Sequence, residues 1–385
     1  MAKQGNSLVL PASLYVKRGW HLRPHARSPV LSSKKKTAAR SVPQVLKKDH
    51  RLLPLDETRE LRRTHKWIAM MENEDEDEDE ENGEQAQFGQ QPEDTKSVKH
   101  QLREDLDVSR LHRRVYKGIP DEMRGQVWFA LSRDEETRPY LSLAELMELD
   151  SEHDVQIDLD VPRTMRYHER FYTRYGEGQC TLFTVLHSMS LICKECGYCQ
   201  GMGPTAAMLL LHMPTADALE MMVRLHDVYG FHDVYRHGFP GLRAEFYVLQ
   251  ALLKHCCPRA AKELERHGLA PSAYATGWLM TLFHNVLPYH TQLRVWDAFF
   301  LHGFDVLLIV ATALIRSLDA QLSRSTSSFD LHEVLSASMV PESDDALLMW
   351  VHRAIQDPKI KSIIGDHRRT WSRMEQEGSH TTYFV

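Results

Sequence analysis

The sequence has few cysteines, no long apolar run and no acidic side chain in its first 48 residues. Only six of its 385 residues are cysteine, and four of these lie between positions 180 and 199. This distribution is not that of a small secreted disulfide fold, and it favours a reducing, cytosolic setting. The most apolar runs, 206–213 and 305–315, fall well short of the ~20 residues of a membrane-spanning helix. Both runs are therefore predicted to be buried helices.

The charge balance is slightly acidic, with a formal net charge of −6. A chain of this charge has no overall electrostatic attraction to nucleic acid, so nucleic acid is not an expected partner. The hydrophobic fraction of 42% and the charged fraction of 26% are typical of soluble folded proteins. The length allows one large domain or two smaller ones.

The first 54 residues carry the opposite charge from the rest of the chain. Residues 1–48 contain Lys and Arg without Asp or Glu, and serine and proline are interspersed among them. A solvated disordered tail is the favoured interpretation. A transit peptide, a nuclear signal and a patch that contacts anionic lipid are alternatives. The repeated prolines argue against one continuous amphipathic targeting helix.

Two further segments precede the apolar part of the chain. The pattern over 55–71 predicts a short helix in which Leu61, Trp67 and Ile68 share part of one face. The run "ENEDEDEDEENGE" (72–84) then begins an acidic, polar stretch that extends to about residue 100. Like charges at this density cannot be buried, so 72–100 is predicted to be a disordered linker. Binding of a basic partner is the alternative role.

From Leu111 onward, apolar residues recur every three or four positions, and glycine and proline separate the periodic segments. Helical patterns include 144–150, 166–175, 181–195, 217–225 and 245–256, and no convincing alternating strand is present. The predicted fold class is therefore all-α, a single large domain of many short helices over 111–320. Residues 321–385 are predicted to form a partly helical C-terminal extension.

The cysteines of "CKECGYCQ" admit three interpretations: a redox dithiol, a metal site or small apolar side chains. A helical pattern precedes Cys196, which places it near a helix C-terminus, where the dipole raises a thiol pKa. The spacing Cys193-x-x-Cys196-x-x-Cys199 lacks a fourth ligand, because Gly203 occupies the position that a ferredoxin-like run requires. The favoured interpretation is partly buried small side chains, with no metal.

Three other motifs combine charged or polar residues with turn residues. The first is "GIPDEMRGQVW" (118–128), in which Pro120 suits the first position of a helix. The second is "IDLDVPR" (157–163), where Pro162 disfavours helix at the preceding valine. The third is "GYCQGM" (197–202), a glycine-led break before an apolar helix expected to begin near Pro204.

Together these motifs resemble the TBC domain of GTPase-activating proteins for Rab GTPases. The matching patterns are Gly-Ile-Pro-x-x-x-Arg-Gly-x-x-Trp, Ile-x-x-Asp-x-x-Arg and Tyr-x-Gln, followed in order by "PGL", "YATGWLMTLF", "LP" and "LRVWDAFFLHG". The resemblance covers about 111–320 and implies a TBC fold of two helical subdomains. It also implies an activator of GTP hydrolysis that acts on a Rab in its GTP-bound state.

The resemblance assigns the catalytic roles. Arg163 corresponds to the family's arginine finger, and Gln200 corresponds to the glutamine that positions the attacking water. GTP and Mg²⁺ belong to the partner GTPase, so no cofactor is expected here, and the absence of a phosphate-binding Gly-rich loop agrees with that division. The chain is thus expected to be an activator rather than an enzyme in its own right. A catalytically silent Rab-binding scaffold is the alternative.

Supporting roles fall to Asp160, Tyr198 and Arg124. Asp160 is expected to hold the guanidinium of Arg163 through a bidentate pair. Tyr198 is expected to contact the GTPase or the surroundings of the fingers, and Arg124 to bind a carboxylate or a helix end. Gly203 and Pro204 depart from the residues that many family members carry at these positions, which affects the start of that helix and its fit to the GTPase.

The resemblance also indicates a setting. A Rab activator in vesicle trafficking is expected in the cytoplasm, peripherally on endomembranes. The basic N-terminus offers one route to such membrane contact.

Overall fold

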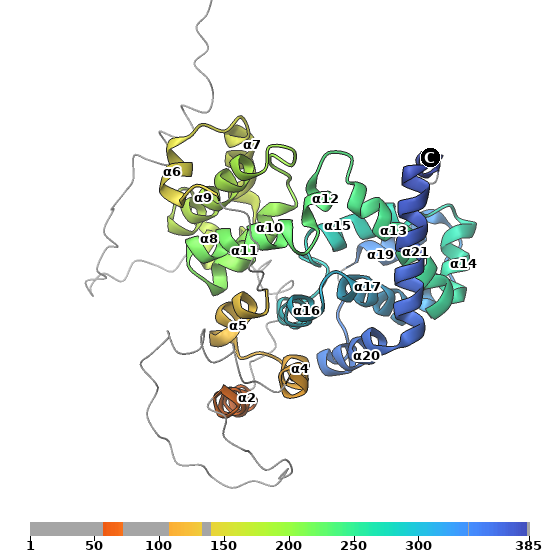
Figure 1. Ribbon diagram of the computed structural model, residues 1–385. Coiled ribbons are helices and arrows are strands. Elements are labelled where there is room, and N and C mark those ends of the chain that lie inside the picture. The colour runs from red at the N-terminus through yellow and green to blue at the C-terminus, as the bar shows by residue number, and fades with distance from the viewer. Residues whose placement is uncertain (1–56, 72–107, 133–139, 338, 383–385) are drawn as a thin grey trace, which may run out of the picture. The chain divides into compact units, whose positions relative to one another are not determined.

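The computed structural model describes residues 57–71, 108–132, 140–337 and 339–382 of the chain (Figure 1). All regular secondary structure in these ranges is helical, which confirms the all-α prediction. The basic tail predicted over 1–54 and the acidic linker predicted over 72–100 lie outside the described residues.

The α-helices are α2 (Glu57–Met71), α4 (Val108–Lys117), α5 (Arg124–Leu131), α6 (Leu143–Glu148), α7 (Asp154–Asp160), α8 (Glu169–Tyr172), α9 (Glu177–Ile192), α10 (Met202–His212), α11 (Thr215–Asp227), α12 (Phe231–Tyr235), α13 (Pro240–Cys256), α14 (Pro258–Arg266), α15 (Ala275–Met280), α16 (Tyr289–His302), α17 (Asp305–Ser317), α18 (Asp319–Leu322), α19 (Ser328–Ser336), α20 (Asp344–Gln356) and α21 (Pro358–Gln376). Four short 3-10 helices are η2 (Asp121–Met123), η3 (Val161–Arg163), η4 (Pro271–Ala273) and η5 (Ser379–Thr382).

The described residues divide into two compact helical units. Unit 1 contains residues 140–223 and 235–238, and unit 2 contains the rest. This division matches the two helical subdomains that the TBC resemblance implies.

Unit 1 is built around α9, which contacts α6, α7, α8 and α10. Leu182, Phe183, Leu186 and Met189 on this helix are almost fully buried. A helix that is apolar on most of its sides requires neighbours all round. The buried His187 ring links α9 to two of them, because Nδ1 lies 2.5 Å from Asp154 Oδ1 and Nε2 lies 3.1 Å from the carbonyl of Leu146.

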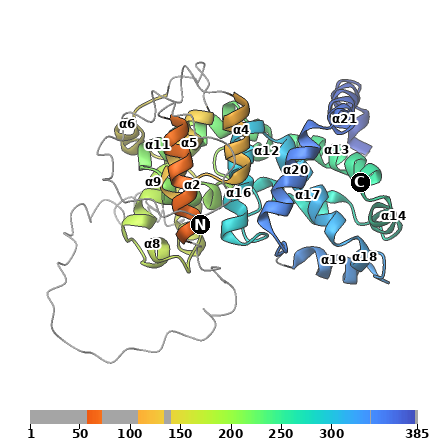
Figure 2. The ribbon, with the colours of Figure 1, turned by 90° about the horizontal axis from the view of Figure 1, so that it is seen from below.

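Unit 2 is built around α16 and α17, and the apolar run 305–315 lies within α17. Helix α17 contacts α13, α16 and α20, and α13 contacts α21. Arg368 on α21 donates two hydrogen bonds to Glu245 on α13, at 2.9 and 3.0 Å. Helices from the C-terminal extension therefore complete the core of this unit (Figure 2). Within the described ranges, no helix combines the length and apolarity needed to cross a bilayer.

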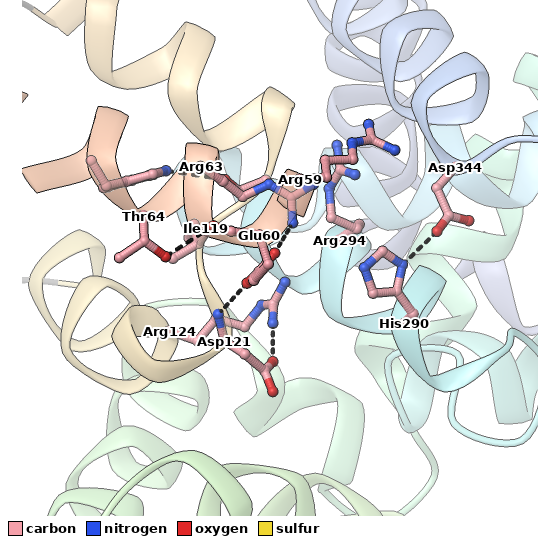
Figure 3. A network of polar contacts seen from close by, with 12 residues as sticks. Arg59, Glu60, Arg63, Thr64, Ile119, Asp121, Arg124, His290, Arg294 and Asp344 are labelled. Carbon is pink, nitrogen blue, oxygen red and sulfur yellow. Dashed lines mark hydrogen bonds and ion pairs between the residues drawn. The ribbon is translucent and has the colours of Figure 1, made fainter. Parts of the chain in front are cut away.

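Helix α2 also belongs to unit 2. Trp67 is fully buried and donates a hydrogen bond of 3.0 Å to the carbonyl of Gly118. Glu60 accepts a bond of 2.9 Å from the backbone amide of Asp121 and pairs with Arg63 at 2.5 Å (Figure 3). These contacts attach α2 to the segment that carries the first sequence motif.

That motif is held to α16 by a buried carboxylate. Asp297 is fully buried and accepts from Arg124 Nε at 3.2 Å, from Trp128 Nε1 at 2.9 Å and from the amide of Ile119 at 3.2 Å. Arg124 also forms an ion pair with Asp121 (Figure 3). Burial by itself would lower the pKa of Arg124, but Asp297 and Asp121 together raise it, so the guanidinium stays charged.

The prediction of a helix over 166–175 is mostly wrong, because only the four residues of α8 (Glu169–Tyr172) are α-helical there. Gln179, which is buried, accounts for the difference. Its Oε1 accepts from the amide of Tyr175 at 3.1 Å, and its Nε2 donates to the carbonyl of Phe171 at 2.8 Å. A side chain from α9 thus satisfies backbone groups that a continuous helix would have paired.

Replacing Arg124 by methionine should lower the free energy of unfolding by about 3 kcal/mol, because Asp297 would remain buried without its ionic partner. The matched control is Asp121→Asn, which removes the other carboxylate, one whose side chain is 49% exposed. That variant should lose less than about 1 kcal/mol. Urea unfolding of the two variants and the parent makes the comparison. Equal losses would show that the buried pair is not the stabilising one.

His302 should make stability depend on pH. Burial, and then the nearby His112, His352 and Lys361, lower the pKa of His302 from 6.5 to about 4. A depressed histidine pKa means that the unfolded chain binds the proton more readily. The titration of His302 should therefore leave the unfolding free energy unchanged above about pH 6.5. It should lower that free energy as the pH falls from 6.5 toward 4.

Urea midpoints between pH 7.5 and 4.5 measure this dependence. His302→Asn should flatten it, whereas the exposed His255→Asn should leave the parental slope unchanged. A parental slope in His302→Asn would contradict the assignment.

Candidate functional site

The residues singled out by the second and third motifs come together in unit 1. Arg163 is the last residue of η3, and Gln200 lies in the turn between α9 and α10. Both side chains are exposed, that of Arg163 to 55%. Arg124 lies in unit 2, where it binds the two carboxylates described above.

Asp160 links the two motifs. It is the last residue of α7 and is 2% exposed. Its Oδ1 pairs with Nη2 of Arg163 and accepts from Gln156 Nε2 at 3.1 Å, while its Oδ2 accepts from the Tyr198 hydroxyl at 2.8 Å. The prediction that Asp160 binds Arg163 through both carboxylate oxygens is therefore wrong. One carboxylate oxygen holds the guanidinium, and the other holds the segment that precedes Gln200.

The expectation that Pro162 keeps Val161 out of a helix is also wrong. Val161 has φ −52° and ψ −47°, and the chain passes from α7 directly into η3. Pro162 stands in the first turn of this 3-10 helix, where its missing amide hydrogen costs no helical bond. The Thr164 hydroxyl donates to the carbonyl of Asp160 at 2.9 Å and closes the turn. Arg163 therefore projects from a short ordered turn.

Gly203 allows α10 to approach this turn. The helix begins at Met202, two residues earlier than the sequence suggests. A Cβ atom on Gly203 would lie 3.2 Å from Thr164 Oγ1 and 3.9 Å from the Tyr198 hydroxyl. The sequence shows Gly203 only as a departure from the family pattern and gives Thr164 no role. Their proximity depends on tertiary structure, and no local sequence pattern reveals it.

Tyr198 remains a hydroxyl donor at all physiological pH values. Burial, followed by its hydrogen bond to Asp160, raises its pKa strongly. A protonated hydroxyl is the form that donates to the buried carboxylate, so the link between the two motifs does not titrate near neutral pH.

The neighbouring thiols are not activated. Burial, followed by the nearby Cys193, raises the pKa of Cys196, and burial raises that of Cys199. A thiol with a raised pKa is mostly protonated at neutral pH and is a weak nucleophile. This argues against the dithiol interpretation and agrees with small, partly buried side chains.

Comparison with known proteins gives the family. The model of the Rab-GTPase-TBC domain matches residues 121–323, more than half of the chain. A TBC domain-containing protein of Schizosaccharomyces pombe is 37% identical over 256 residues, which are 65% of this chain and 61% of that protein. The chain thus spans less than two thirds of this relative. TBC1 domain family member whacked of Drosophila melanogaster is 30% identical over 284 residues, covering 70% of this chain and 77% of that protein.

A solved structure shows the same fold. The Chlamydomonas flagellar RabGAP TBC domain superimposes with a TM-score of 0.60 at 19% identity, over 78% of this chain and 94% of that one. Taken with the matched family model, this similarity shows that the chain belongs to the Rab-GTPase-TBC domain family, a family of GTPase activators.

Proposed function

We propose that this protein accelerates GTP hydrolysis by a Rab-family GTPase, supplying Arg163 and Gln200 in trans. One observation carries the proposal. The exposed guanidinium of Arg163 is anchored on the buried Asp160, and Asp160 is bonded through Tyr198 to the turn that presents Gln200. Family membership supplies the reaction, and the contacts of Asp160 link the two segments that carry these exposed side chains.

The chemistry requires positive charge where the transferred phosphoryl group gains negative charge. An arginine finger supplied in trans accelerates the reaction by roughly 10³–10⁵-fold, equivalent to about 4–7 kcal/mol. Asp160 contacts Nη2 of Arg163, so Nε and Nη1 remain to donate to phosphoryl oxygens of the partner. Anchoring also reduces the conformational entropy that the long side chain loses on docking.

Gln200 takes the second role. Its exposed side-chain amide carries both a donor and an acceptor, which suits it to orient the attacking water. The partner carries GTP and Mg²⁺, and this chain adds no cofactor. The protein is therefore an activator that completes the active site of another protein.

The proposed partner is the GTP-bound form of a Rab, met in the cytoplasm at the surface of an endomembrane. The basic N-terminal residues 1–54 would favour peripheral contact with anionic lipid. A scaffold that binds a Rab without accelerating hydrolysis is the second candidate. The presence of both finger residues favours the activator.

Arg163→Lys should lower the acceleration of GTP hydrolysis by about 10³-fold or more, because lysine keeps the charge but lacks the planar fork. Single-turnover hydrolysis across a panel of GTP-loaded Rabs provides the measurement. Arg166→Lys is the matched control, since this arginine is also exposed and lies three residues further along. The control should retain the parental rate on the responsive Rab.

Equal rates for Arg163→Lys and the parent would remove Arg163 from the finger role. A parent that binds a Rab tightly and accelerates none of the panel would establish the scaffold.

A Rab whose own switch glutamine has been replaced by alanine should still respond to the parent protein, because Gln200 positions the water in trans. The same Rab should lose most of that response with Gln200→Ala, whereas binding of the two proteins should change little. Single-turnover rates and affinities measured in parallel separate these effects. A Rab variant that fails to respond to the parent protein, yet still binds it, would contradict the role of Gln200.

A further inference from the structure

Helix α7 carries a short apolar ridge close to Arg163, formed by Val155 and Leu159. The two residues are four positions apart and therefore lie on the same face of the helix. Val155 is 38% exposed and Leu159 is 61% exposed, which makes Leu159 the most exposed leucine in the described part of the chain. Single apolar residues on a surface are normal, so the ridge is informative only because of what surrounds it.

The opposite face of α7 is packed into unit 1. Asp154, Ile157 and Asp160 are buried and repeat at helical spacing on the side away from the ridge. Asp154 binds the buried His187 of α9, with Oδ1 2.5 Å from Nδ1. These contacts fix the rotation of the helix, so the ridge is held outward.

The segment that leads to Gln200 follows α7 along its length. At one end of the helix, a Cβ atom on Gly197 would lie only 2.2 Å from Nε2 of His153, so the backbone there is in close contact with that ring. At the other end, the Tyr198 hydroxyl donates to Asp160 at 2.8 Å. Helix α7 therefore borders both segments that carry the proposed fingers.

The ridge leads directly to Arg163. Because the chain passes from α7 into η3 without a break, Arg163 follows Leu159 by four residues and Val155 by eight. These separations correspond to about 6 and 12 Å along the helix axis. Gln156, at the edge of the ridge, donates at 3.1 Å to the oxygen of Asp160 that also holds Arg163. The ridge thus ends within about one helical turn of the finger.

Polar side chains flank the ridge on both sides. Helical spacing places Gln156 on one side and Asp158 on the other. Asp158 pairs with Arg174 at 2.7 Å, and its backbone carbonyl accepts from the same guanidinium at 3.1 Å. An apolar centre with a polar rim is the usual anatomy of a protein–protein interface.

A protein that brings a nucleotide to Arg163 would cover this ridge. A stable interface buries roughly 800 Å² on each partner, equivalent to a disc with a radius of about 16 Å. Both ridge residues lie within that distance of Arg163 along the helix. We propose that Val155 and Leu159 form the apolar anchor for the GTP-bound Rab and select Rabs that present an apolar patch beside the nucleotide site. This assignment rests on the activator function proposed above, because it takes a Rab as the partner.

The ridge and the finger act on different quantities. Burial of Val155 and Leu159 would stabilise the complex equally before and during the reaction, so it would increase affinity and leave the maximal rate unchanged. The charge of Arg163 would act on the transition state and therefore on the maximal rate. A second copy of this chain is the competing occupant of the ridge. The Rab is favoured because it carries phosphates that complement the neighbouring arginine.

The test uses the double variant Val155→Gln/Leu159→Gln of the full chain. Glutamine removes the apolar surface, adds no charge and is compatible with a helix. Single-turnover GTP hydrolysis by a responsive Rab is measured at increasing concentrations of the activator. The concentration that gives half of the maximal rate should rise by about tenfold or more, whereas the maximal rate should change by less than about twofold.

Two control variants separate the ridge from general effects. Phe329→Gln/Val340→Gln makes the same chemical change at two exposed apolar positions of unit 2 and should behave as the parent does. Val155→Ile/Leu159→Met keeps the ridge apolar and should retain the parental half-saturating concentration. Thermal unfolding verifies that each variant folds.

Three results would overturn the proposal. One is a parental half-saturating concentration in Val155→Gln/Leu159→Gln, and another is an equal increase in this variant and in Phe329→Gln/Val340→Gln. The third is a parent that self-associates through the ridge, with the double variant monomeric and unchanged in its affinity for the Rab. That result would make a second copy the occupant.

Affinity for the Rab loaded with a non-hydrolysable GTP analogue is measured in parallel, because it does not depend on catalysis. A parent that binds a Rab, loses that binding with Val155→Gln/Leu159→Gln and accelerates no hydrolysis would refute the activator function and support the ridge. A parent that accelerates hydrolysis, with equal affinity in the ridge variant, would refute the ridge alone.

Discussion

The buried carboxylate of Asp160 is the interaction on which the proposed site depends. A carboxylate that is 2% exposed is costly to bury unless donors surround it. Here those donors come from α7, from η3 and from the segment after α9. Satisfying one charge therefore fixes the position of both segments that carry the proposed fingers. The exposed ends of Arg163 and Gln200 remain available to a partner because the constraint acts beneath them.

Unit 2 also contains a buried aspartate surrounded by hydrogen-bond donors, but there it holds helices together. The fully buried Asp297 gathers Arg124, Trp128 and the amide of Ile119 around α16. These residues belong to the first sequence motif, which is thereby explained as a structural element. Two of the family motifs thus contribute to the surroundings of a buried aspartate. Asp160 lies beneath the exposed Arg163, and Asp297 binds the buried Arg124. Because the two arrangements are similar, a motif alone does not separate the arginine proposed as a finger, Arg163, from the structural Arg124.

Helix α2 illustrates a different relation between sequence and structure. Arg59, Arg62, Arg63 and Lys66 occupy one face of a helix by their spacing alone. Spacing of this kind on its own suggests a solvated surface. With α2 anchored by Trp67 and Glu60, Arg59 instead pairs with Asp345 of α20, and Arg63 pairs with Glu60. The contacts that orient the helix come from residues more than 40 positions away, so the sequence pattern could not show them.

The sequence by itself determined the helical class, the order of the family landmarks and the residue types that could act on a phosphoryl group. Those properties depend on periodicity and on short motifs, which are local. The tertiary structure decided that Asp160 uses one oxygen for Arg163 and the other for Tyr198, and that Gln179 interrupts the helix expected over 166–175. It also decided that Gly203 lies against Thr164. In each case a polar group is satisfied, or a close approach is permitted, by a residue distant in the chain, and periodicity carries no information about such pairs.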